Sequence, residues 1–261
     1  MNMTTVDVLV QGYPGRATHH GGLGWSTVTL VRADGRNILV DVGAFGARKP
    51  ILKALTGRGV QPADITDVVL THAHYDHAVN FTLFPQATVW IGDEELSWAA
   101  AQPPGFNPIP ELYVRELCAS PRVRRVRDGE TFLPGLQAIA APGHTPGHLL
   151  FYLTDAQEPV LFTGDAAKNR AELLSMSVAD TDDAQASARS LETIWQLWKR
   201  RPGTLLVPGH DLSMRLDADG RPVYVGERAA EIGAWFSETL QQTKIDLCCP
   251  PRLDFSQLAN A

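Results

Sequence analysis

The chain has 261 residues, of which 44% are apolar and 20% charged, and it carries a formal net charge of −6. This composition is typical of a globular protein with a sizeable core, and no linker or low-complexity run divides it, so we expect one domain over residues 1–261. An acidic chain without a basic cluster is not expected to bind nucleic acid or an anionic membrane. No long apolar run or signal-peptide pattern is visible, and the cysteine count is an odd three, which together favour a cytoplasmic protein.

The first elements in chain order are strands rich in β-branched residues, expected over residues 5–12, 26–33 and 37–43. The dipeptide Asp34-Gly35 between the second and third runs is a hairpin signal. Residues 47–59 then predict a helix that ends at glycine. The short apolar run Asp67–Leu70 predicts a buried strand.

Strands and helices continue to alternate beyond this point. Residues 102–111 contain four prolines in ten positions and are expected to be irregular. Strands are predicted over 87–92, 135–143, 149–154, 159–164 and 204–210, and helices over 93–101, 182–200 and 226–242. This interleaving predicts an α/β fold in which sheets and helices form layers.

A dense cluster of potential metal ligands follows the buried strand in the segment VVLTHAHYDHAVN. His72, His74, Asp76 and His77 lie within six residues. An isolated histidine is usually a surface or core residue, but three at this density favour a shared role. Neutral imidazole is the commonest zinc ligand, and carboxylates supplement it. A turn directly after a strand can direct several such side chains into one small volume, so we expect a metal site here.

Three later segments offer further ligands in turns that follow predicted strands. They are APGHTPGH with His144 and His148, LFTGDAAKN with Asp165, and LVPGHD with His210. Five histidines and two aspartates exceed what one tetrahedral ion accepts. They suit two ions, one held by three histidines and the other by histidine and aspartate, with a carboxylate that bridges them.

The order of these motifs, His-x-His-x-Asp-His, Gly-His-Thr-Pro-Gly-His, Gly-Asp and Pro-Gly-His, resembles the metallo-β-lactamase superfamily over Val6 to Asp211. The resemblance implies an αββα sandwich of two mixed β-sheets flanked by helices, with the metals at one edge of the sheets. It also implies that the first metal is bound by His72, His74 and His144. The second metal would be bound by Asp76, His77 and His210, and Asp165 would bridge the two. Among members of this superfamily, the metallo-β-lactamase-domain-containing proteins and the quorum-quenching lactonases resemble the chain most.

The resemblance further implies a metal-dependent hydrolase, in which two metals activate a water as hydroxide for attack on a small ester, lactone or thioester. A lactone is the first expectation, and zinc is the expected metal, with iron and manganese as alternatives. Asp76 is expected to orient the hydroxide or to pass a proton to the leaving group. Lactonases of this family commonly carry a tyrosine three residues after the bridging aspartate, whereas this chain has Lys168. That lysine either contacts the substrate as a second catalytic residue or is solvated.

Two other functions stay open: a mononuclear iron dioxygenase of the same superfamily and a non-catalytic metal-binding protein. The complete ligand set weakens the second. His148 is expected outside the ligand set, and His19 and His20 lie in a glycine-rich loop where they either contact substrate or are solvated. The expected partner is a small-molecule substrate, and a homodimer is left open.

Overall fold

The computed structural model describes residues 4–17, 19 and 23–248. The chain divides into two compact units, residues 1–225 and 226–261. Within the described residues, no helix combines the length and the apolar character needed to cross a bilayer. The expectation of one domain over residues 1–261 stays a prediction.

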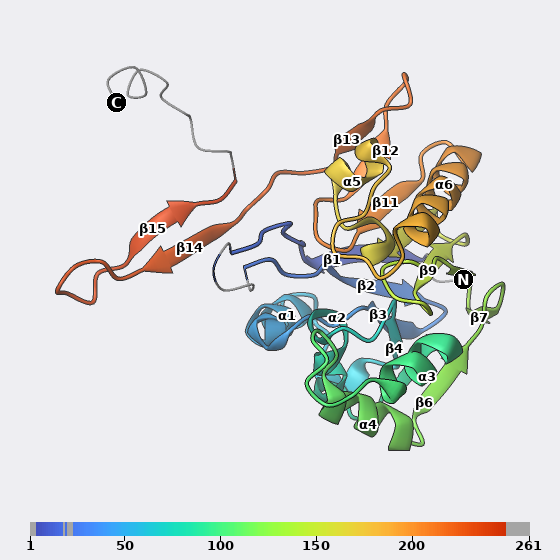
Figure 1. Ribbon diagram of the computed structural model, residues 1–261, viewed down its shortest axis with the longest axis horizontal. Coiled ribbons are helices and arrows are strands. Elements are labelled where there is room, and N and C mark those ends of the chain that lie inside the picture. The colour runs from blue at the N-terminus through green and yellow to red at the C-terminus, as the bar shows by residue number, and fades with distance from the viewer. Residues whose placement is uncertain (1–3, 18, 20–22, 249–261) are drawn as a thin grey trace. The chain divides into compact units, whose positions relative to one another are not determined.

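The first unit contains a six-stranded sheet in the order β1-β2-β3-β4-β5-β6 (Figure 1). Strands β1 to β3 pair antiparallel, and β3 to β6 pair parallel. Asp34 and Gly35 form the predicted hairpin turn between β2 and β3, with φ values of 47° and 75°, because such two-residue turns need positive φ. The strands are β1 Thr5–Val10, β2 Val28–Ala33, β3 Arg36–Val40, β4 Asp67–Leu70, β5 Thr88–Gly92 and β6 Val123–Val126.

A seven-stranded sheet in the order β13-β12-β11-β10-β9-β8-β7 packs against the first. Strands β10 and β11 pair parallel, and the other neighbours pair antiparallel. The strands are β7 Thr131–Leu133, β8 Leu136–Ala140, β9 Leu149–Leu153, β10 Val160–Gly164, β11 Leu205–Pro208, β12 Met214–Leu216 and β13 Pro222–Tyr224.

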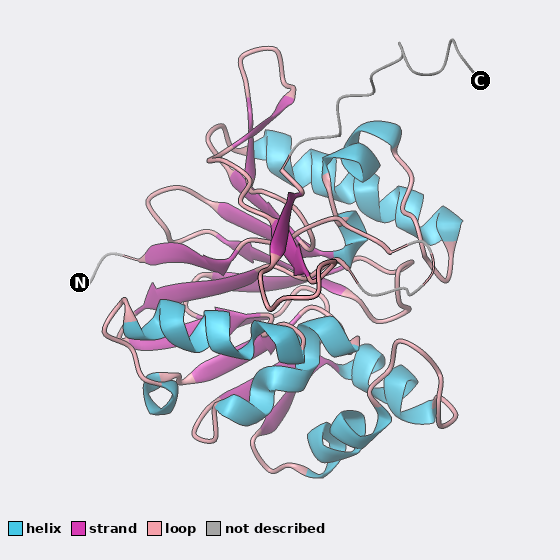
Figure 2. Ribbon diagram, turned by 90° about the vertical axis from the view of Figure 1, so that its left-hand side faces the viewer, coloured by secondary structure: helices cyan, strands magenta, loops and turns pink. Residues whose placement is uncertain are grey.

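Helices cover the outer faces of both sheets, with α1 to α4 on one side and α5 and α6 on the other (Figures 1 and 2). The α-helices are α1 Arg48–Thr56, α2 Tyr75–Ala78, α3 Asp93–Ala101, α4 Glu111–Ala119, α5 Arg170–Ser175 and α6 Ala184–Arg200. Short 3-10 helices are η1 Phe45–Ala47, η2 Pro62–Asp64, η3 Val79–Leu83 and η4 Asp165–Ala167. The predicted αββα sandwich is confirmed.

Successive side chains along a strand point to opposite faces of its sheet, and this alternation creates the apolar layers of the core. In β4, Val68 and Leu70 face the helices α1, α3 and α4, whereas Val69 between them faces the second sheet. In β9, Phe151 faces the first sheet and Tyr152 faces α6. Because side chains alternate with a period of two, each central strand contributes to two apolar layers at once.

Two expectations for helices need correction. The predicted helix over 226–242 is wrong: the second unit contains an antiparallel hairpin of β14 Glu231–Ala234 and β15 Thr243–Asp246. Gly233 disfavours a helix interior by about 1 kcal/mol, and the partly buried Ile232 and Ala234 alternate with exposed neighbours as a strand requires. The helix α4 was not anticipated, because the prolines before it suggested only an irregular segment.

The chain segments that carry the motifs lie where strands of both sheets end. Strands β3 and β4 are parallel neighbours in one sheet, and β10 and β11 are parallel neighbours in the other. Their carboxyl ends therefore meet at one edge of the sandwich, where an α/β scaffold carries its site. Asp41 follows β3, His72 follows β4, Asp165 follows β10, and His210 follows β11.

Candidate metal centre

All seven residues predicted as ligands converge at this edge. Their side chains form three groups, and in each group one potential ligand atom from every residue lies within 4.8 Å of the others. The groups are His72 with His74 and His144, His72 with His77 and Asp165, and Asp76 with His77 and His210. Sequence segments more than a hundred residues apart are therefore combined in one cluster.

Asp165 lies between the groups. Its Oδ1 is 3.1 Å from His77 Nε2 and 3.2 Å from His210 Nε2. Its Oδ2 is 3.3 Å from His144 Nε2. The two oxygens of one carboxylate thus face different groups of histidines.

The spacing of the other donor atoms fits divalent metal ions. His74 Nδ1 lies 3.0 Å from His144 Nε2, and His77 Nε2 lies 3.2 Å from His210 Nε2. Nitrogens bound to one tetrahedral zinc at 2.0–2.1 Å would be about 3.3 Å apart. His72 Nε2 is buried and has no hydrogen-bond partner within the described part of the chain, as expected of a ligand atom. The histidine and aspartate cluster is therefore suited to divalent metal binding.

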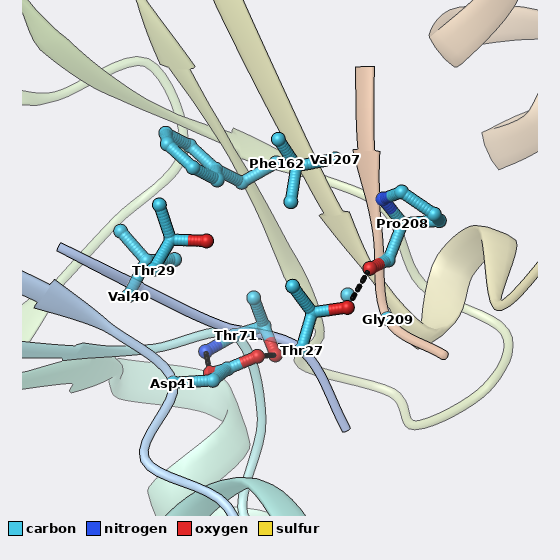
Figure 3. A pocket seen from close by; sticks show the side chains of 10 residues that line it. Thr27, Thr29, Val40, Asp41, Thr71, Phe162, Val207, Pro208 and Gly209 are labelled. Atoms are coloured by element: carbon cyan, nitrogen blue, oxygen red, sulfur yellow. Dashed lines mark hydrogen bonds between the residues drawn. The ribbon is translucent and has the colours of Figure 1, made fainter. Parts of the chain in front are cut away.

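A buried carboxylate orients the imidazole of His77. Asp41 Oδ2 accepts a hydrogen bond of 2.8 Å from His77 Nδ1, which leaves Nε2 directed at the cluster. Thr71 donates to Asp41 from its backbone nitrogen and from its hydroxyl, both at 2.9 Å (Figure 3). The same hydroxyl lies 3.0 Å from His72 Nδ1, so Asp41 and Thr71 together fix two of the imidazoles.

Two further contacts fix the other side of the cluster. His144 Nδ1 lies 2.9 Å from the carbonyl oxygen of Asp180, so its Nε2 faces the cluster. His148 Nε2 accepts a hydrogen bond of 3.0 Å from the backbone nitrogen of Asp165. As predicted, His148 lies outside the three groups, and it holds the chain segment that presents Asp165.

Burial and neighbouring charges set the protonation states. Burial lowers the pKa of His74 to about 4 and lowers the pKa values of His72 and His144 well below the usual range. For His77, burial opposes protonation, but the carboxylates of Asp165, Asp76 and Asp41 raise the pKa well above its ordinary value. Burial alone would raise the carboxyl pKa of Asp165. The nearby histidines, above all His210, outweigh this effect and hold the pKa well below the usual range. Neutral imidazoles and an ionised carboxylate are the forms that bind metals, so His72, His74, His144 and Asp165 are ready to bind, whereas His77 would release a proton when a metal binds.

Lys168 lies beside the cluster but is neither solvated nor isolated. Its Nζ donates to the carbonyl oxygen of Ala179 at 2.6 Å and is 3.2 Å from Glu172 Oε1. Only 14% of its side chain is exposed. Its carbonyl oxygen accepts a hydrogen bond of 2.8 Å from the backbone nitrogen of His210. The segment around Lys168 therefore also positions a ligand.

Of the two histidines in the glycine-rich loop, only His19 lies within the described residues. His19 is exposed, and His20 lies outside the described residues. The predicted contact of these side chains with substrate stays a prediction.

Two important carboxylates were missed by the sequence interpretation. Asp41 is a single charged residue at the end of a buried strand, and that position is a signal that could have identified it. Glu95 resembled an ordinary acidic residue in the first turn of a helix, yet it is fully buried, and burial raises its pKa to about 7. No pattern in the sequence distinguishes it from Asp93 and Glu94.

Comparison with known proteins identifies the family of the chain. The family model of the metallo-beta-lactamase superfamily matches residues 21–210. An N-acyl homoserine lactonase from Bacillus sp is 28% identical over 181 residues, which cover 67% of this chain and 67% of that protein. Metallo-beta-lactamase domain-containing protein 1 from Mus musculus is 31% identical over 197 residues, which cover 74% of this chain and 66% of that protein. The chain thus spans about two thirds of the length of these curated relatives.

A solved structure shares the fold. A dizinc quorum-quenching lactonase in complex with a product matches with a TM-score of 0.64 at 20% sequence identity, over 78% of this chain and 80% of that chain. The extent of the family match decides the assignment. The chain belongs to the metallo-beta-lactamase superfamily, and its lactonase relatives indicate a metallo-hydrolase.

Proposed function

We propose that this metallo-hydrolase uses a dinuclear centre to open a small lactone or to cleave a related ester or thioester. The observation that carries the proposal is the position of Asp165, whose two oxygens face His144 on one side and His77 with His210 on the other. A site for a single ion would not need a carboxylate shared between two complete groups of ligands.

The ligand assignment follows from the groups. His72, His74 and His144 would hold the first ion, Asp76, His77 and His210 the second, and Asp165 would bridge them. Bound divalent ions would polarise the substrate carbonyl and lower the pKa of a water. Imidazole and carboxylate suit zinc, and the matched lactonase is described as dizinc. Iron and manganese accept the same types of ligand.

Within the chain, Asp76 is the residue best placed to handle protons. Its side chain is 17% exposed, more than that of His77 or Asp165, and its Oδ2 lies 3.3 Å from His210 Nε2. A carboxylate at the open side of the cluster can orient an attacking water and deliver a proton to the leaving oxygen. We therefore assign Asp76 both a ligand role and a catalytic role.

Lys168 is proposed as a contact for the substrate. An ammonium group has three donors, and the contacts of Nζ with Ala179 and Glu172 use two of them. A third donor is left for a carboxylate or a developing oxyanion of the substrate. The charge of Lys168 is close enough to affect the pKa values of His74 and His144, which supports its place beside the reacting atoms.

A lactone is favoured over other substrates for two reasons. Relatives and structural neighbours include N-acyl homoserine lactonases. In addition, apolar rings border the cluster: the ring of Trp98 lies 6.5 Å from that of His74 and 6.2 Å from that of Phe106. Such a border suits the apolar part of a small acyl substrate.

The proposal is tested with a panel of lactones, thioesters, carboxylic esters and phosphodiesters, assayed before and after treatment with a chelator. Turnover of a lactone that is lost with the metal and returns with added zinc supports the proposal. A protein that binds metal but hydrolyses no member of the panel would instead be a metal-binding protein. Oxygen uptake by an iron-loaded form would identify a dioxygenase, and either result would overturn the proposal.

A further inference from the structure

The ligands of the first group come from two different sheets. His72 and His74 follow β4 in the six-stranded sheet, whereas His144 lies between β8 and β9 in the seven-stranded sheet. The ladder hydrogen bonds of either sheet fix strands only within that sheet. Productive sites need their groups held to within about 0.5 Å, so contacts between the two loops must set the separation of these histidines.

Glu95 makes such a contact with both loops. Its Oε1 accepts a hydrogen bond of 2.8 Å from the backbone nitrogen of Ala73, which stands between His72 and His74. Its Oε2 accepts one of 2.6 Å from Thr145 Oγ1, directly after His144. The backbone nitrogen of Gly147 donates as well. One fully buried carboxylate thus spans the two loops.

The backbone around Glu95 is equally fixed. A Cβ atom at Gly147 would lie 2.1 Å from Glu95 N and 2.4 Å from Glu95 Cα, and one at Gly92 would lie 2.9 Å from Gly147 O. The loop that carries His144 is therefore seated directly on the first turn of α3. The helix α3 cannot move away from this loop without losing the backbone contact between Gly147 and Glu95. The backbone of Glu95 is therefore fixed by packing, and its carboxylate is fixed by hydrogen bonds.

An ordinary helix-terminal role does not explain this residue. Acidic residues in the first turn of a helix interact favourably with the helix dipole. In α3, Asp93 has this position and also pairs with Arg125. Asp67, another fully buried carboxylate, is compensated by the guanidinium of Arg36 at 2.9 Å. The donors that the described residues offer to Glu95 are neutral groups, and burying a charge on neutral donors alone is costly.

We propose that Glu95 is a positioning residue that sets the separation of His72 and His74 from His144 by joining Ala73 to Thr145. The inference rests on the proposed metal centre. Glu95 contacts neither substrate nor metal in this account. Its effect passes through the two loops to the geometry and affinity of the first metal position.

The test compares wild-type protein with Glu95→Gln, using Asp67→Asn as the matched control. An amide has one acceptor atom in place of two, so at least one donor to residue 95 loses its partner. We expect Glu95→Gln to bind one of two metals about 10- to 100-fold more weakly, the usual effect of losing a partner that orients ligands. Chelator competition measures the affinity, and the visible absorption of the cobalt(II)-substituted protein reports on the geometry of the site.

Asp67→Asn removes an equally buried carboxylate from the opposite end of β4 and is expected to lower stability without changing metal affinity or the cobalt spectrum. Equal metal affinity in wild type and Glu95→Gln, or an equal loss in Asp67→Asn, would overturn the inference. If the wild type itself binds no metal, the proposed function fails. If it binds two and Glu95→Gln does the same with an unchanged spectrum, only the positioning role fails.

A second pair of variants covers the case in which Glu95→Gln does not fold. Thr145→Val keeps the shape of the side chain but removes the hydroxyl, and Thr145→Ser restores the hydroxyl. We expect Thr145→Val to weaken the same metal position and to shift the cobalt spectrum, and Thr145→Ser to recover both. Wild-type metal binding in Thr145→Val, with a defect only in Thr145→Ser, would contradict the inference, because a role in packing alone depends on the methyl group and not on the hydroxyl.

Discussion

Asp41 and His77 are joined by a hydrogen bond of 2.8 Å between a buried carboxylate and a fully buried imidazole. The bond joins the segments that follow two neighbouring strands, since Asp41 follows β3 and His77 lies in the helix that follows β4. Asp41 adopts a positive φ of 51°, a conformation that aspartate and asparagine tolerate better than most residues. The local backbone is therefore adapted to deliver this carboxylate beneath the cluster.

Asp41→Asn should keep the backbone conformation but weaken the second metal position. The amide nitrogen would face His77 Nδ1 and favour the tautomer with its proton on Nε2, the atom directed at the cluster. We expect a loss in metal affinity of about 10- to 100-fold, measured by chelator competition. Wild-type affinity in a folded Asp41→Asn protein would show that this hydrogen bond does not orient a ligand.

Asp76→Ala should lower kcat by about 10²- to 10⁴-fold, because general acid–base groups contribute rate factors of this size. The measurement is steady-state hydrolysis of the best lactone, paired with a metal analysis of the same sample. Full activity together with full metal content would exclude the catalytic role of Asp76.

Lys168→Met should raise KM or lower kcat for the substrate if the ammonium group contacts it. The matched control is Glu172→Gln, which breaks the same ion pair but leaves the charge of Lys168 in place. If both variants show the same kinetic defect, the ion pair maintains the loop and Lys168 has no contact with substrate. Unchanged KM and kcat in Lys168→Met would give the same answer.

The stability of the metal-free protein should depend on pH through His148. Burial lowers the pKa of this histidine from 6.5 to about 3. Because the pKa is lower in the folded protein, the unfolded chain binds a proton at a higher pH than the folded protein does. The contribution of His148 to the free energy of unfolding is therefore present above pH 6.5 and is lost as the pH falls. Between about pH 7 and about pH 5 the loss from this residue approaches about 2 kcal/mol.

Denaturant unfolding of wild type and His148→Gln at both pH values isolates this effect. Glutamine can still accept the hydrogen bond from the backbone nitrogen of Asp165 but does not titrate in this range. The free energy of unfolding should fall more in the wild type than in the variant. Parallel losses in the two proteins would mean that His148 does not bury a neutral imidazole.

Much of the fold could be predicted because its information is local. The β-branched runs of β1 to β5, the turn at Asp34-Gly35 and the apolar face of α6 each depend on residues close in sequence. The cluster was also predictable, since His72, His74, Asp76 and His77 lie side by side and their partners follow strands. The hairpin β14–β15 was not, because a helical spacing of apolar residues near Trp235 competes with a strand alternation around Gly233.

The hydrogen-bond partners of the supporting carboxylates could not be predicted from the sequence alone. The role of Asp41 depends on the pairing of β3 with β4, and that of Glu95 depends on the packing of α3 against a loop of the other sheet. Neither pairing is encoded by a local pattern. Likewise, Lys168 looked solvated or free to bind substrate, and only the approach of the segment that carries Ala179 revealed its contacts.

The most direct test of the account is the metal content of the purified protein, measured by elemental analysis without exposure to chelators. The shared carboxylate of Asp165 predicts about two zinc ions per chain. About one iron ion per chain, with the second group of ligands empty, would contradict the dinuclear centre and the hydrolytic mechanism built on it.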